Sequence, residues 1–279
     1  MNILGLISQL IGIKTLRLTN RTTPKFLQYQ YDLRVIDLSH NNLVGKFPNW
    51  LLENNTRLEA LILEDNYFTG PLTVPFDLRS NVTFIDISDN YLQGPIPTNF
   101  GLVFPYLEKL YMSKNAFQGS IPSSLGNMES LSVLDMSKNS LSGTIPIHFT
   151  MACNILYSLK LSYNHFQIFP TSCNLNYLSF LYLDNNHFSG KIPNCISLMQ
   201  SAESIDLSNN YFSGMLPTWM GNMSSLSTIV LAQNQLEGQI PIELCKLDYL
   251  SFLDLSENNF FWLCSILLQF ITHKVCSSK

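Results

Sequence analysis

The sequence predicts an α/β solenoid, a fold in which short coils of similar sequence stack side by side and share a parallel β-sheet. Two observations support this. An asparagine recurs at intervals of 22 to 25 residues, and a fixed pattern of apolar residues surrounds each one. The ten asparagines are Asn41, Asn66, Asn90, Asn115, Asn139, Asn164, Asn186, Asn210, Asn234 and Asn258.

Each repeat, called a rung below, follows the frame LxxLxLxxNxLxGxIP, which is the signature of a leucine-rich repeat. A well-preserved rung reads Leu131, Leu134, Met136, Asn139, Leu141, Gly143, Ile145, Pro146. We therefore expect a leucine-rich repeat horseshoe, with the parallel sheet on its concave face and short helical or 3₁₀ turns and loops on its convex face.

Each part of the frame has a structural meaning. The alternating apolar pair, for example Leu134 and Met136, points inward from a short strand. The asparagine amide then satisfies backbone groups of the following turn. Proline opens an outer segment in which apolar residues recur at every third position, as in Pro122, Leu125 and Met128, and this spacing favours short helical or 3₁₀ turns.

A single rung cannot fold alone. About seven buried apolar side chains at ~2 kcal/mol each do not offset the ordering of some two dozen residues at ~1–2 kcal/mol each. We therefore predict one array of ten rungs over residues 33–259. Residues 1–32 are predicted to be a degenerate N-terminal repeat remnant, and residues 260–279 a C-terminal tail outside the repeat.

Composition excludes some classes of function. Hydrophobic residues make up 46% of the chain, charged residues only 13%, and the net charge is −4, which disfavours nucleic-acid binding. The spacing of the six cysteines contains no CxxC, which argues against a zinc or thioredoxin-like site. We expect no metal and no cofactor.

The LxGxIP segment resembles the plant-specific class of leucine-rich repeats. The chain is most similar to the extracellular region of plant receptor-like proteins, and residues 26–58 carry a close match. This resemblance implies ligand sensing on the extracellular side of the plasma membrane, in defence or development, with a co-receptor kinase as signalling partner.

The ends of the chain differ from that family. Residues 1–13 are apolar but lack the basic region and small-residue cleavage site of a signal peptide. The apolar run 260–271 is shorter than the ~20 residues of a membrane helix. A membrane connection is therefore expected only through segments outside this chain, and the sequence is interpreted as an internal fragment of a larger receptor gene.

Four N-glycosylation sequons are consistent with the secretory route. Their acceptors are Asn20, Asn54, Asn81 and Asn222, of which Asn54 and Asn222 fall on outer segments. Among the cysteines, Cys173 and Cys195 lie at similar positions of adjacent rungs, within reach of a disulfide. The alternative is two buried thiols.

Two candidate constellations for other chemistry are weak. Asp37, Ser39 and His40 resemble a hydrolytic set, but Asp and Ser recur at these positions in other rungs, where we expect hydrogen-bonded ladders on the inner sheet. The chain is therefore predicted not to be an enzyme. His165 and His187 occupy equal positions of neighbouring rungs and suit either a metal or pH-sensitive pair or, as we favour, exposed turn residues.

Ligand binding is predicted at outward positions of the concave sheet that depart from the repeat consensus, because these side chains have no role in the core. Asp65 with Asp89, and Lys114 with Lys138, predict an acidic patch followed by a basic one. The candidate ligand-binding residues are Lys109, Tyr111, Lys114, Lys160, Tyr163, Phe180, Tyr182, Asp184, Thr228 and Val230.

These observations predict a non-enzymatic recognition module for a peptide, protein or glycan ligand. Two alternatives stay open at this point. One is a secreted leucine-rich inhibitor of a wall-degrading enzyme, similar to polygalacturonase-inhibiting proteins. The other is an inactive truncated receptor fragment.

Overall fold

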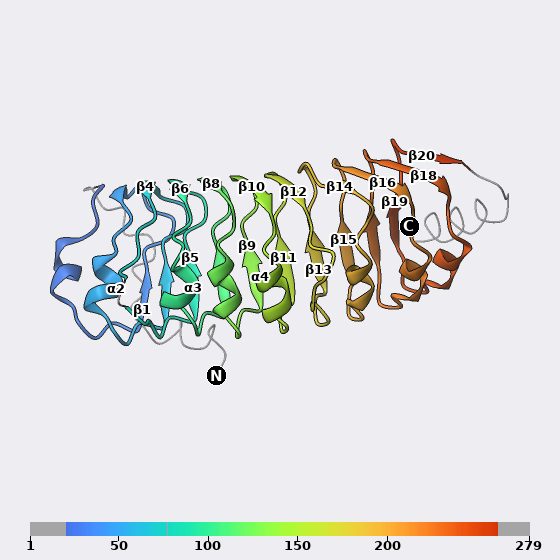
Figure 1. The fold of residues 1–279 in the computed structure, drawn as a ribbon. Coiled ribbons are helices and arrows are strands. Elements are labelled where there is room, and N and C mark those ends of the chain that lie inside the picture. Colours follow the sequence, from blue (N-terminus) through green and yellow to red (C-terminus); the bar gives the residue numbers. More distant parts are fainter. Residues whose placement is uncertain (1–20, 77, 262–279) are drawn as a thin grey trace. The chain divides into compact units, whose positions relative to one another are not determined.

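The computed structural model describes residues 21–76 and 78–261 (Figure 1). The chain forms two compact units, a first unit within Met1–Leu141 and a second unit within Ser142–Lys279. The predicted boundaries 1–32, 33–259 and 260–279 stay a prediction. Residues 1–13 and 260–271, which were predicted not to form a signal peptide or a membrane helix, lie outside the described residues except for 260 and 261. Among the described residues, the helices are too short or too polar to cross a membrane.

Each unit contains a parallel main sheet, built from one three-residue strand per rung. In the first unit the order is β1 (Val35–Asp37), β3 (Ala60–Ile62), β5 (Phe84–Asp86), β7 (Lys109–Tyr111) and β9 (Val133–Asp135). In the second unit it is β11 (Ser158–Lys160), β13 (Phe180–Tyr182), β15 (Ser204–Asp206), β17 (Thr228–Val230) and β19 (Phe252–Asp254).

A further set of parallel strands follows the asparagines. The first unit has β2 (Val44–Lys46), β4 (Tyr67–Pro71), β6 (Tyr91–Pro95) and β8 (Ala116–Gly119). The second has β12 (His165–Ile168), β14 (Ser189–Gly190), β16 (Tyr211–Met215), β18 (Gln235–Gln239) and β20 (Asn259–Phe261). Strand β10 (Ser140–Thr144) begins against β8 and ends against β12.

Short helices form the outer segments, as predicted. They are η1 (Lys25–Tyr29), α2 (Trp50–Asn54), α3 (Phe100–Val103), η2 (Ser123–Asn127), α4 (Ile147–Ala152), η3 (Asn194–Leu198), η4 (Thr218–Asn222) and η5 (Ile242–Lys246). Proline directly precedes six of them, including η2 and η5, because its fixed φ and missing N–H suit a helix start. Neighbouring outer segments pack closely: a Cβ on Gly221 would meet the carbonyl oxygen of Glu243 at 2.2 Å.

The core lies between the main sheet and the outer segments of each unit. Leu134, Met136 and Leu141 are fully buried, as the frame predicts. In the second unit, phenylalanines at the position of Leu141 stack along the rungs, with ring centroids 6.1 Å apart for Phe166 and Phe188. The predicted fold class is therefore confirmed.

The buried asparagines do more than close their own turn. The Nδ2 of Asn66 donates to Leu63 O at 3.1 Å in its own rung and to Leu38 O at 2.9 Å in the preceding one. Its Oδ1 accepts from the backbone N–H of Leu43 at 3.0 Å. Asn186 makes the same set in the second unit. Each of these amides therefore joins two rungs, which the repeat pattern alone does not reveal.

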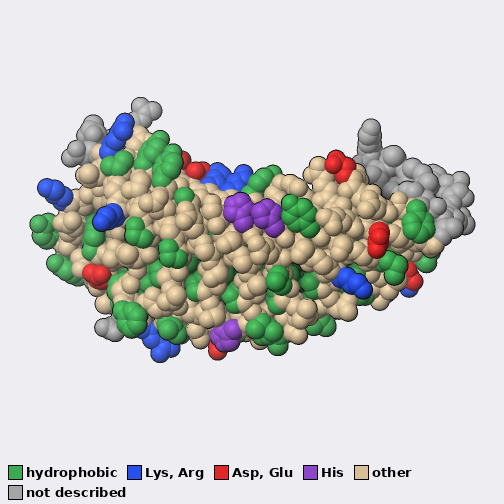
Figure 2. Space-filling model, turned by 45° about the horizontal axis from the view of Figure 1, so that its top comes forward, with side chains coloured by type: hydrophobic (Ala, Val, Ile, Leu, Met, Phe, Trp, Pro, Cys, Tyr) green, Lys and Arg blue, Asp and Glu red, His purple; other side chains and the backbone are tan. Residues whose placement is uncertain are grey.

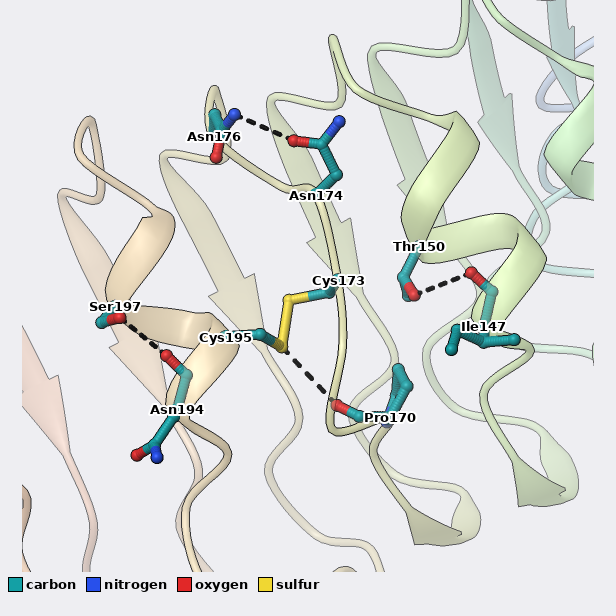
Figure 3. Close-up of a disulfide and its surroundings, with 9 residues drawn as sticks. All are labelled: Ile147, Thr150, Pro170, Cys173, Asn174, Asn176, Asn194, Cys195 and Ser197. Carbon is teal, nitrogen blue, oxygen red and sulfur yellow. Dashed lines mark hydrogen bonds between the residues drawn. A yellow bond between two sulfur atoms is a disulfide. The ribbon is translucent and has the colours of Figure 1, made fainter.

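Cys173 and Cys195 form a disulfide, with Cα atoms 5.5 Å apart (Figure 3). Cys173 lies in the loop between β12 and β13, where no helix forms, and Cys195 lies on η3. The bond therefore joins an irregular loop to the outer segment of the next rung. Cys153 is a buried thiol outside this bridge, and burial raises its pKa to about 12.

Candidate ligand-recognition surface

The first and third residues of the main strands point away from the core. In each unit they define the outer face of the main sheet, which is the predicted concave face and lies on the opposite side from the outer segments. None of the ten predicted ligand-binding residues is buried. Eight lie on or near this face, half-buried, whereas Lys114 and Tyr163 are in the turns that follow it. Three belong to the first unit and seven to the second.

In the first unit, Tyr111 lies between two carboxylates. The strand register places it beside Asp86 on β5 and Asp135 on β9. Its ring centroid is 5.7 Å from that of Phe84, and Lys109 lies beside Phe84 in the register. Burial raises the pKa of Tyr111, and the charges of the two aspartates raise it further. This row offers an aromatic ring and two acidic groups to a ligand.

Asp86 was not among the predicted site residues. Burial raises its pKa to about 6, despite the bonds that Asp86 accepts from the hydroxyl and backbone N–H of Ser88. The sequence predicted hydrogen bonding of Asp and Ser on the inner sheet, and the structure shows where these bonds form. They form within a rung, because Ser88 N–H is two residues from the carboxylate. The same pair recurs at Asp37 and Ser39, Asp135 and Ser137, Asp206 and Ser208, and Asp254 and Ser256.

The residue before each repeat asparagine adopts a left-handed backbone, with φ between 50° and 56°. Lys114 occupies such a position and pairs with Asp89 of the preceding rung, Nζ to Oδ2 at 2.7 Å. The predicted acidic and basic patches therefore meet in an ion pair and are not separate at this boundary. The pair also raises the pKa of Lys114.

Ser39 and His40 of the set that resembles a hydrolytic site each contact a different carboxylate. His40 Nδ1 lies 3.0 Å from Asp65 Oδ2 of the next rung, and this bond raises the pKa of His40. Ser39 Oγ donates instead to Asp37 Oδ1 at 2.6 Å. The histidine is thus turned towards a neighbouring rung and serves as partner to an exposed carboxylate.

In the second unit, three aromatic residues and one lysine form a cluster, called the aromatic cluster below. Lys160 Nζ lies 5.7 Å from the ring centroid of Tyr182. The ring of Phe180 is stacked at 6.4 Å from Tyr182 and meets Tyr157 edge-on at 5.2 Å. The cluster combines a large aromatic area with a positive charge, which is typical of recognition surfaces.

Acidic and amide groups border this aromatic cluster. Asp184 accepts hydrogen bonds from the hydroxyl of Ser162 and from the side chain of Asn185. Asp206 lies between Tyr182 and Val230 in the strand register, and burial raises its pKa. The predicted residues Thr228 and Val230 lie on β17, two strands from β13, because β15 lies between these strands.

A second row of aromatic side chains follows the asparagines and was not among the predicted ligand-binding residues. In the first unit, Tyr67 and Tyr91 stack with ring centroids 5.7 Å apart. In the second unit, His165 and His187 stack at 5.3 Å, and Tyr211 lies 5.9 Å from His187. Figure 2 shows two adjacent histidine side chains beside a hydrophobic one. The signal was present in the sequence as an aromatic residue directly after each of these asparagines.

The predicted glycosylation acceptors remain predictions. Asn54 ends α2 and Asn222 ends η4, both on outer segments. Asn81 is exposed before β5, and its side chain donates to Thr56 O at 3.3 Å. Asn20 lies outside the described residues.

Comparison with protein families agrees with this architecture. A leucine rich repeat model matches residues 32–54, 81–102, 106–128, 130–151 and 177–199, and a second one matches residues 200–260. The chain belongs to the leucine-rich repeat family. Together these matches cover more than half of the sequence.

Among leucine-rich repeat proteins, this chain is similar to plant receptor-like proteins, as the LxGxIP segment indicated. It is 62% identical over 52 residues to Cuscuta receptor 1 of Solanum lycopersicum, covering 19% of this chain and 5% of that protein. It is 53% identical over 75 residues to Receptor-like protein 45 of Arabidopsis thaliana, covering 27% and 8%. The aligned segments thus span less than a tenth of either relative.

The leucine-rich repeat fold is also that of a solved plant receptor. The Arabidopsis receptor kinase HAESA, solved in complex with the peptide hormone IDA and the co-receptor SERK1, matches with a TM-score of 0.73 and 32% identity. The match covers 86% of this chain and 44% of the HAESA chain.

Proposed function

We propose that this chain is a non-enzymatic ligand-recognition module of a plant cell-surface receptor-like protein, on the extracellular side of the plasma membrane. One observation carries the proposal. The outer face of the second unit's main sheet presents the aromatic cluster of Lys160, Phe180, Tyr182 and Tyr157, although these side chains play no part in the core.

The ligand proposed for this face is a peptide. The receptor kinase HAESA, which shares the fold, was solved with a peptide hormone. Chemistry supports the same class: the rings suit apolar or aromatic side chains of a ligand, and Asp184 and Asp206 offer acceptors for its basic groups or backbone N–H groups. Tyr163, Thr228 and Val230 extend the surface, and Lys109, Tyr111 and Lys114 form a separate contact region in the first unit.

A co-receptor kinase is the proposed signalling partner. The support is the HAESA complex, which contains the co-receptor SERK1 together with the peptide hormone. In this proposal the chain supplies recognition, while the kinase activity belongs to the partner.

The test is a binding screen of the secreted chain against a synthetic library of secreted plant peptides. Replacing Phe180 or Tyr182 by alanine should weaken binding of a selected peptide by about 2 kcal/mol or more, because aromatic anchors dominate such interfaces. The matched control is Ile242→Ala, an exposed apolar residue on the outer segment η5. Equal losses from both faces would remove the proposal.

A further inference from the structure

The aromatic row that follows the asparagines of the second unit lines a cavity distinct from the aromatic cluster on the main sheet. The cavity has a volume of about 360 Å³. Within the described part of the chain, its lining consists of tyrosine, asparagine and histidine residues, with no Lys, Arg, Asp or Glu among them. The lining includes Tyr163, His165, Asn185, His187, Asn209 and Tyr211.

Two parallel rows of hydrogen-bonding groups border this cavity. The first consists of His165, His187 and Tyr211, whose successive ring centroids are 5.3 and 5.9 Å apart. The second is an amide chain, in which Asn209 Nδ2 donates to Asn185 Oδ1 at 2.5 Å and Asn185 Nδ2 donates to Asp184 Oδ2 at 2.8 Å. Each amide nitrogen carries a second proton, and the rings carry donors and acceptors on their rims.

The stacking of the two imidazole rings determines which of their atoms a ligand can reach. The two imidazole rings are nearly parallel, with 23° between their planes, and both histidines are exposed. A ligand can therefore reach the ring edges, which carry the imidazole nitrogens. The ring edges present imidazole nitrogens, followed by the phenol of Tyr211, as a ladder of polar atoms with the period of the rungs. A matching ligand needs hydroxyl groups repeated at the same period.

The spacing of the rings, 5.3 and 5.9 Å, distinguishes between two classes of extended polymer as ligands. A peptide strand rises by ~3.3 Å per residue, so side chains on one face repeat at roughly 6.6 Å, which is longer than both ring spacings. An extended β-1,4-linked hexose chain advances by about one rung spacing per sugar. Successive sugars are turned over by about half a rotation, but each sugar carries hydroxyl groups on both edges, so either edge of the chain offers a hydroxyl group on every sugar. The neutral lining also favours an uncharged sugar over a uronic acid or a phosphate ester.

We propose that this edge of the second unit binds a neutral β-1,4-linked oligosaccharide, with one sugar residue on each of the three rungs of His165, His187 and Tyr211. The imidazoles and the phenol bond to sugar hydroxyls from one side. The amides of Asn185 and Asn209 bond to them from the other. This site borders the peptide surface proposed for the main sheet at Tyr163 but includes none of the residues of the aromatic cluster.

The experiment measures binding of cellohexaose to the full chain by isothermal titration calorimetry. Saturable binding is expected, and the double substitution His165→Ala and His187→Ala should weaken it by about tenfold or more, since two hydrogen-bonding groups are lost. Tyr211→Phe keeps the ring and removes only the hydroxyl, so it tests the ladder with minimal risk to folding.

The controls use the same repeat position and the same sugar. Tyr67→Ala together with Tyr91→Ala alters the equivalent stacked pair of the first unit and should leave cellohexaose binding unchanged. Maltohexaose has the same composition but α-1,4 linkages and a coiled shape, so it should not bind. Absent binding, equal binding of maltohexaose, tighter binding of hexagalacturonic acid, or insensitivity to the second-unit substitutions would each overturn the proposal.

Discussion

The two units share one backbone but differ in what they place on it. The residues before the repeat asparagines have the same left-handed backbone in both units. In the first unit they include the charged partners Lys114 and Asp89, whose atoms lie 2.7 Å apart. In the second they include Asn185 and Asn209, joined by an amide hydrogen bond. The repeat thus determines geometry, whereas the variable positions determine surface chemistry.

The largest expected effect tests whether the framework is equivalent in the two units. Asn90→Ala and Asn210→Ala should each lower the free energy of unfolding by about 4 kcal/mol, because each leaves buried backbone groups unsatisfied at ~1–3 kcal/mol apiece. Asn90 accepts from Phe68 N–H and donates to Leu63 O, and Asn210 makes the same contacts in its unit. Urea unfolding would measure both.

The exposed Asn127→Ala is a control for general effects of asparagine removal, since its side chain donates to Ser124 O within its own outer segment. Asn127→Ala should lower the free energy of unfolding by well under half as much as Asn90→Ala or Asn210→Ala. A large difference between Asn90→Ala and Asn210→Ala would show that the two units do not use the asparagines in the same way.

The disulfide belongs to the second unit, so its removal should affect the stability of that unit and not of the first. Replacing both Cys173 and Cys195 by alanine should destabilise the second unit by about 3 kcal/mol, the usual cost of losing a bridge over a loop of roughly two dozen residues. Hydrogen exchange followed by mass spectrometry would show the loss of protection segment by segment. The loop between β12 and β13 and the helix η3 should lose most protection, while β3 and β5 of the first unit should be unchanged. Uniform loss across both units would contradict this.

The smallest effect concerns two half-buried carboxylates of the outer face, Asp86 and Asp206. The pKa of Asp86 is raised to about 6, so the folded state binds its proton more tightly than the unfolded chain does. Stability should therefore fall as pH rises from about 4 to 6. Asp86→Asn should remove this fall and raise the free energy of unfolding at pH 7 by about 1–2 kcal/mol, less than the full shift implies because one side meets solvent.

Asp206→Asn makes the same change in the second unit, where burial also raises the pKa of the carboxylate. Asp206→Asn should therefore also raise the free energy of unfolding at neutral pH. Thermal unfolding between pH values of about 4 and 7 would measure both variants, and a loss of stability in Asp86→Asn at neutral pH would show that the carboxylate stabilises the fold.

Periodicity predicted the fold because one residue pattern is repeated with one geometry. The apolar pair of each rung, the asparagine and the proline before an outer segment all have the predicted roles. The bridging of neighbouring rungs by Asn66 was not predictable, since a sequence frame does not show which acceptor a buried amide reaches.

The candidate surface was predicted only in part, for a related reason. Tyr182 and Phe180 were identified because they depart from the consensus on an outward strand position. His187 was expected to be an exposed turn residue and Tyr211 was not singled out, because the repeat frame assigns no role to the residue after the asparagine. The raised pKa of Asp86 depends on the crowding of its neighbours, which becomes visible only in three dimensions.

The amides that tie each rung to the one before it have an evolutionary consequence. Their donors and acceptors sit at constant offsets, so a tandem duplication inserts a module that finds matching partners on either side. The interval between Asn164 and Asn186 is shorter than the others. There a disulfide joins the irregular loop to the next module. Leucine-rich repeat proteins built this way can gain or lose modules by recombination and diversify their exposed residues independently.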